Sequence, residues 1–128
     1  MTATLNHTEE AAQNQNQQQG MPLHRFLTYQ VAKELFATVV AAKISDPNLR
    51  DQAMRAAQSS CLNIAEAAGR WSTRDRAHKC HIARGECCEV VAAMEIAVIA
   101  GACDAEIATK ATAIGTRLYA LLSGLIRK

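Results

Sequence analysis

Residues 63–89 read NIAEAAGRWSTRDRAHKCHIARGECCE. An amphipathic repeat ends at Gly69 within this segment, and the longest amphipathic repeat of the chain begins just after it. Glycine commonly follows a helix C-terminus, and Ser72 or Thr73 is a suitable N-cap because its hydroxyl can accept a bond from a first-turn N–H. We therefore expect a corner between two helices here, and we infer the rest of the fold from it.

Apolar and small residues recur at steps of three and four in four segments, which indicates four amphipathic helices. We expect these helices over residues 23–44, 47–69, 73–100 and 105–128. Asp46 and Asp104 stand where N-caps are needed, and Pro47 suits the first turn of the second helix. Four helices with short connections predict an all-α, antiparallel up-down-up-down four-helix bundle over residues 22–128. Residues 1–21 are polar and low in complexity, and we expect a flexible, disordered N-terminal tail.

Composition limits the classes of protein that fit this chain. Apolar residues make up 49% of it and aromatic residues 4%, which favours close-packed helices over a sheet. The five cysteines form no CxxC motif, and no secretory signal or long apolar run occurs, so we expect a cytoplasmic protein with no membrane contact. Glycine-rich phosphate loops are absent, and we predict no cofactor.

The first and last helices each carry two adjacent apolar rows, which is more apolar surface than one bundle needs to bury. We expect the surplus to lie between subunits of a homo-oligomer. The alternative is that both rows are buried inside one chain.

Several short patterns carry a resemblance to a known family. They are Arg55-Ala56-Ala57, then Asn63-Ile64-Ala65-Glu66 with Arg70, then Ile82-Ala83 with Gly85 and Glu89. Over residues 23–126 the chain resembles the four helix bundle proteins of the 23S rRNA intervening-sequence (S23) family. It departs from the family pattern at Ala67, where glycine is usual, and at Glu86, where serine is usual. The resemblance implies a ring, with a homopentamer as the expected form and no established enzyme activity. It also implies a relationship to the basic accessory proteins of diversity-generating retroelements, which bind a reverse transcriptase and RNA.

Positive charge is densest around the corner. The net charge of the chain is +2, and the first 20 residues hold −2, so the remainder carries +4. The candidate nucleic-acid-binding residues are Arg70, Arg74, Arg76, Lys79 and Arg84. Trp71 beside them could stack on a base. Cations at a helix N-terminus oppose the helix dipole, which hints at another reason for the charge. The alternative is a solvated helix end with local salt bridges.

Two further groups of polar residues are candidate sites. We interpret Asn63, Glu66 and Glu89 as a structural polar network that fixes helix register, with a partner-binding or acid–base pocket as the alternative. His78 and His81, with the nearby cysteines, match no standard zinc spacing, and we predict no metal site.

These features predict a non-enzymatic, homo-oligomeric binding module for structured RNA or DNA, or for a nucleic-acid enzyme. The alternative is a protein-interaction scaffold with no nucleic-acid role. A hydrolase that uses Glu66 and Glu89 has little support, because no nucleophile–base pair accompanies them.

Overall fold

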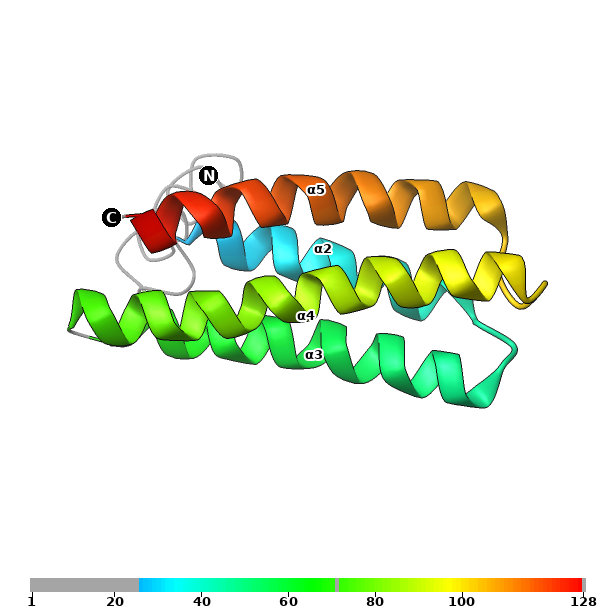
Figure 1. Ribbon diagram of the computed structural model, residues 1–128, viewed down its shortest axis with the longest axis horizontal. Helices are drawn as coiled ribbons and strands as arrows, with labels where there is room; N and C mark the ends of the chain where they lie inside the picture. The colour runs from blue at the N-terminus through cyan, green and yellow to red at the C-terminus, as the bar shows by residue number, and fades with distance from the viewer. Residues whose placement is uncertain (1–25, 71, 128) are drawn as a thin grey trace, which may run out of the picture.

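The computed structural model describes residues 26–70 and 72–127, which form four helices (Figure 1). Their bounds are α2 Leu27–Ala42, α3 Pro47–Ala68, α4 Thr73–Ile99 and α5 Ala105–Arg127. The described residues contain no strand, and the prediction of an all-α four-helix fold is confirmed. The predicted tail over residues 1–21 lies outside the described residues.

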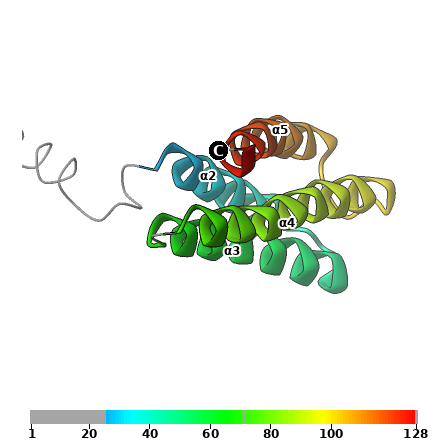
Figure 2. The ribbon, with the colours of Figure 1, turned by 60° about the vertical axis from the view of Figure 1, so that its left-hand side comes forward.

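The helices lie side by side, and each contacts the next along the chain, while α2 also contacts α5 (Figures 1 and 2). At one end, the backbone N–H of Ser45 donates to the carbonyl of Ala102 at 3.0 Å, which joins the α2–α3 connection to the α4–α5 connection. The α3–α4 connection lies at the other end, where Phe26 before α2 and Leu125 near the end of α5 line one cavity. Consecutive helices therefore run in opposite directions.

Local capping chemistry sets the helix bounds close to the predicted ones. The Asp46 carboxylate accepts from the N–H of Leu49 at 3.0 Å, and Ser72 Oγ accepts from the N–H of Asp75 at 3.2 Å, so both predicted caps are confirmed. α2 ends two residues earlier than expected, because Lys43 adopts a left-handed conformation with φ of 47°. Ile44 is consequently outside the helix, yet it is fully buried and closes that end of the core.

The core is built mainly from small residues, so the helix backbones approach closely. In α4 the predicted row is buried along its whole length; its members are Cys80, Ala83, Cys87, Val90, Met94 and Ala97. α3 faces it with alanines, Ser60 and Ile64, while α2 and α5 supply leucine and valine. None of the described helices is long and apolar enough to cross a membrane.

A close helix crossing lies at Gly115 of α5. A Cβ atom there would stand 2.6 Å from Cγ2 of Val91 on α4, and the Cys87 thiol donates to the Gly115 carbonyl at 3.2 Å. Gly85 of α4 marks no such crossing within the described chain. A Cβ at Gly85 meets nothing within 4 Å, because this position faces away from the core.

Candidate nucleic-acid interface

The corner between α3 and α4 carries exposed arginines on a short, capped connection. Gly69 ends α3, Arg70 follows it, and Ser72 starts α4. Arg74 and Arg76 lie in the first turn of α4 and are exposed. Neither side chain makes a hydrogen bond or an ion pair within the described residues, so their charges are available to a ligand. Trp71 lies outside the described residues.

Glu66 of α3 partly neutralises the corner. Lys79 Nζ lies 2.7 Å from the Glu66 carboxylate, and an Arg70 guanidinium nitrogen lies 3.9 Å from the same oxygen. The hydrogen bond from Lys79, followed by the charges of Lys79 and Arg70, lowers the pKa of the Glu66 carboxyl below its ordinary value. Ion pairs this exposed contribute little to stability, so a phosphate can compete for both cations.

Arg84 lies apart from the other four predicted cations. Its guanidinium donates to Ser123 Oγ at 3.1 Å and lies 5.3 Å from the centre of the Tyr119 ring, both on α5. Arg84 is half-buried between α4 and α5. Arg70 and Lys79, in contrast, both contact the Glu66 carboxylate of α3. We call Arg70, Arg74, Arg76 and Lys79 the basic corner.

The structure divides the predicted polar network into separate contacts. Asn63 Nδ2 donates to the backbone carbonyl of Ser59 at 3.0 Å within α3. It also donates to Glu86 Oε1 at 3.0 Å, and this second bond bridges α3 and α4. Glu66 is exposed and bonds the basic corner instead. Glu89 is exposed and makes no side-chain bond within the described residues, because it lies one turn beyond Glu86 and away from α3. The bridging role of Glu86 was missed, although its position after Gly85 departs from the family pattern.

The histidines and cysteines do not converge. Among the described residues, no group of three or more potential ligands is close enough to hold a metal ion. All five cysteines are unpaired. Burial raises the pKa of the Cys87 thiol to about 11, whereas Cys88 beside it is exposed.

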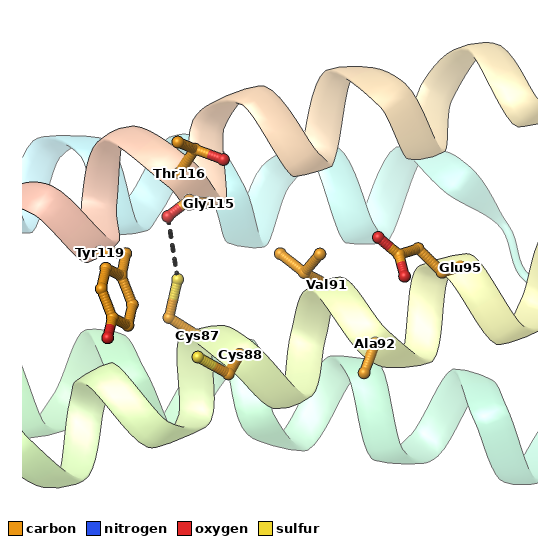
Figure 3. A pocket seen from close by; sticks show the side chains of 8 residues that line it. All are labelled: Cys87, Cys88, Val91, Ala92, Glu95, Gly115, Thr116 and Tyr119. Carbon is orange, nitrogen blue, oxygen red and sulfur yellow. Dashed lines mark hydrogen bonds between the residues drawn. The ribbon is translucent and has the colours of Figure 1, made fainter.

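A shallow groove runs between α4 and α5 (Figure 3). Tyr119 stands at one end of the view and Glu95 at the other, with Val91 and Gly115 between them. The groove continues toward the α4–α5 connection along Val98, Ile99, Ala105 and Ala108. Its lining is mainly apolar, with three threonines and with Glu95 as the charged member. We call it the α4–α5 groove.

A separate cavity of about 320 Å³ opens at the end of the bundle beside the basic corner. Its lining comes from α3, α4, α5 and the residue before α2, and we call it the corner pocket. Its residues are Phe26, Ala67, Thr73, Arg76, Cys80 and Leu125.

Comparison with known proteins supports the resemblance found in the sequence. No curated protein matches the chain. The family model described as 23S rRNA-intervening sequence protein matches residues 26–124, which include all four helices almost to the end of α5. This chain therefore belongs to the 23S rRNA-intervening sequence protein family.

Proposed function

We propose that this protein is a non-enzymatic, homo-oligomeric binding module that contacts structured RNA through its basic corner. The observation that carries the proposal is the pair of exposed arginines, Arg74 and Arg76, which have no anionic partner within the described residues. An arginine without a partner keeps its full charge for phosphate, which it binds by two parallel hydrogen bonds.

The surroundings of these arginines favour a polyanion over a single small anion. Arg70 and Lys79 lie beside them and are held only by the exposed carboxylate of Glu66. Phosphates spaced along a nucleic acid can engage several such cations at once, and each contact releases counterions. The family model adds a context in ribosomal RNA, since its description refers to 23S rRNA intervening sequences.

Oligomerisation would multiply this binding, and the exposed apolar side chains support it. Ile96 and Ile99 of α4 are 51% and 86% exposed, and Tyr119 at the α4–α5 groove is 44% exposed. The opposite side of the bundle exposes Val40, where Lys43 and Arg50 line a second hollow between α2 and α3.

A Glu95-bearing groove on one side and a basic hollow on the other favour contact between unlike faces of neighbouring copies. Such heterologous contacts generate a closed ring when the rotation between copies allows it, and we propose a pentamer. Each subunit of the ring would then present one basic corner, so weak phosphate contacts would add by multivalency.

We propose that the protein acts in the cytoplasm. The five unpaired cysteines suit a compartment that keeps thiols reduced.

The rival function is a protein-interaction scaffold in which the corner is only a solvated surface. The pairing of Lys79 with Glu66 and of Arg84 with α5 favours this rival, because these cations already have partners within the chain.

The test is equilibrium binding of a structured RNA over a salt series, with the oligomeric state measured in parallel. The variant is Arg74→Ala/Arg76→Ala, and the matched control is Lys110→Ala/Arg117→Ala, which removes two exposed cations from α5. The proposal predicts that only the corner variant loses affinity and that its salt slope falls by about 1 for each lost phosphate contact. Equal affinities and slopes for the corner variant and the control, with the oligomer intact, would favour the scaffold.

A further inference from the structure

The corner pocket is a recessed feature that borders the basic corner. Arg76 belongs to both, since it lines the pocket and stands in the first turn of α4. The pocket measures about 320 Å³, which is near the lower limit for small-molecule sites. A single planar ring system fits this size, whereas a duplex or a helix does not.

The lining divides into an apolar wall and a polar rim. Phe26 and Leu125 are half-buried and supply the wall, while Ala67 and Cys80 form the buried floor. Thr73 and Arg76 supply a hydroxyl and a guanidinium at the rim, and both are exposed. The pocket therefore matches a ligand with a flat apolar body and an anion attached to it.

The position of the Arg76 charge supports this division. Burial raises the pKa of the Cys80 thiol, and the Arg76 charge partly offsets the effect. The guanidinium is thus close enough to influence the floor of the pocket electrostatically, although its side chain is exposed to solvent. An anion at the rim would meet a cation that has no other ionic partner within the described residues.

We propose that the corner pocket binds the base of a single unpaired nucleotide next to an RNA stem. Phe26 provides the stacking wall, and Arg76 holds the phosphate of that nucleotide. Arg74, which is exposed in the same turn, holds a phosphate of the adjoining stem. This inference rests on the proposed function and makes it more specific, because the protein would prefer stems with an unpaired end or bulge to blunt stems. Base–aromatic stacking tolerates any sequence, so the preference is for an unpaired base and not for one base identity.

The experiment compares two RNA hairpins with the same stem and one extra nucleotide at the 3′ end. In one RNA the extra nucleotide carries 2-aminopurine, and in the other it is abasic, so both have the same number of phosphates. The full-length protein is expected to bind the 2-aminopurine RNA about tenfold more tightly than the abasic RNA. The fluorescence of 2-aminopurine is expected to fall on binding, because stacking quenches it.

Two variants assign the preference to the pocket. Phe26→Leu keeps an apolar side chain but removes the aromatic face, and Thr73→Leu fills the rim from an exposed position. In each variant the two RNAs are expected to bind with equal affinity. Thermal unfolding of each variant shows whether it is folded, and the two substitutions alter different parts of the pocket.

The outcomes separate this inference from the proposed function. Equal binding of the two RNAs by the unaltered protein, with a normal salt dependence, overturns the pocket and leaves the basic corner standing. Retention of the tenfold preference by both folded variants also overturns the pocket. The absence of salt-dependent binding to either RNA overturns both proposals.

Discussion

Two glycines, each within a helix, are expected to respond in opposite directions to the same substitution. Gly115→Ala places a Cβ 2.6 Å from Val91 Cγ2, a distance at which one of the two groups must move. Gly85→Ala places a Cβ in open space. Neither glycine has a positive φ, so alanine is compatible with both backbones.

The expected changes in unfolding free energy combine two effects. Both variants gain helix propensity, and Gly115→Ala alone also carries a packing cost. Replacing a helical glycine by alanine stabilises a fold by about 0.5–1 kcal/mol, and we expect this gain for Gly85→Ala. Inserting a methyl group into a packed contact costs about 1–3 kcal/mol. Val91 is β-branched and stiff within α4, so it relieves the contact poorly by rotation. Gly115→Ala is therefore expected to be destabilising by about 0–2.5 kcal/mol after the helix gain is included.

Urea unfolding followed by circular dichroism measures both variants on the same scale. A third protein, Gly115→Ala/Val91→Ala, removes the atom that the new Cβ meets. The cost of Gly115→Ala is expected to be smaller in the Val91→Ala background than in the original one, by about 1–2 kcal/mol. If Gly115→Ala were as stabilising as Gly85→Ala, the α4–α5 contact described above would be wrong.

Three further predictions concern the corner, a helix cap and the cysteines. The pKa of Glu66 is lowered in the folded protein, so its ion pairs stabilise the fold at pH values above its ordinary pKa of 4.5. This stabilisation is lost as the pH falls from 4.5 through the lowered pKa of the folded protein. NMR titration is expected to place the Glu66 midpoint below 4.5, and Lys79→Ala is expected to raise it; an unchanged midpoint would contradict the pairing. Asp46→Ala is expected to cost about 1 kcal/mol in unfolding free energy because the bond to the first turn of α3 is lost, whereas an unchanged urea midpoint would show that this cap is not formed. Iodoacetamide labelling at pH 8, followed by peptide mass spectrometry, is expected to modify Cys88 well before its neighbour Cys87, whose thiol is buried and has a pKa of about 11; equal rates would refute that burial.

The sequence predicted the helices well because their apolar spacing and caps act locally. The row along α4 from Cys80 to Ala97 is buried as expected, and Asp46 and Ser72 cap as expected. The end of α2 was misplaced because Ile44 continues the apolar period, while the left-handed turn at Lys43 leaves no local signal in a lysine. The close approach of α4 and α5 at Gly115 was not predicted, since spacing along one helix does not show what stands opposite a glycine.

The candidate site was predicted less completely, because its contacts depend on neighbouring helices. The charge cluster was visible in the sequence, but the sequence did not show that Arg84 turns toward Tyr119 on α5. Asn63 was expected to join a network with Glu89, whereas its partner is Glu86, one turn away along α4. The position of α3 along the axis of α4 decides which turn of α4 faces Asn63. No local sequence pattern encodes that position.

The most direct test of the central claim is to map where RNA touches the protein by photo-crosslinking, with peptide mass spectrometry to identify the crosslinked residues. The basic corner predicts crosslinks on peptides that contain Arg70 to Lys79, at the end of the bundle where α3 meets α4. These crosslinks should weaken in Arg74→Ala/Arg76→Ala and persist in Lys110→Ala/Arg117→Ala. Crosslinks confined to the opposite end, around Ser45 and Ala102, or equal crosslinking in both variants, would contradict the claim that the corner binds nucleic acid.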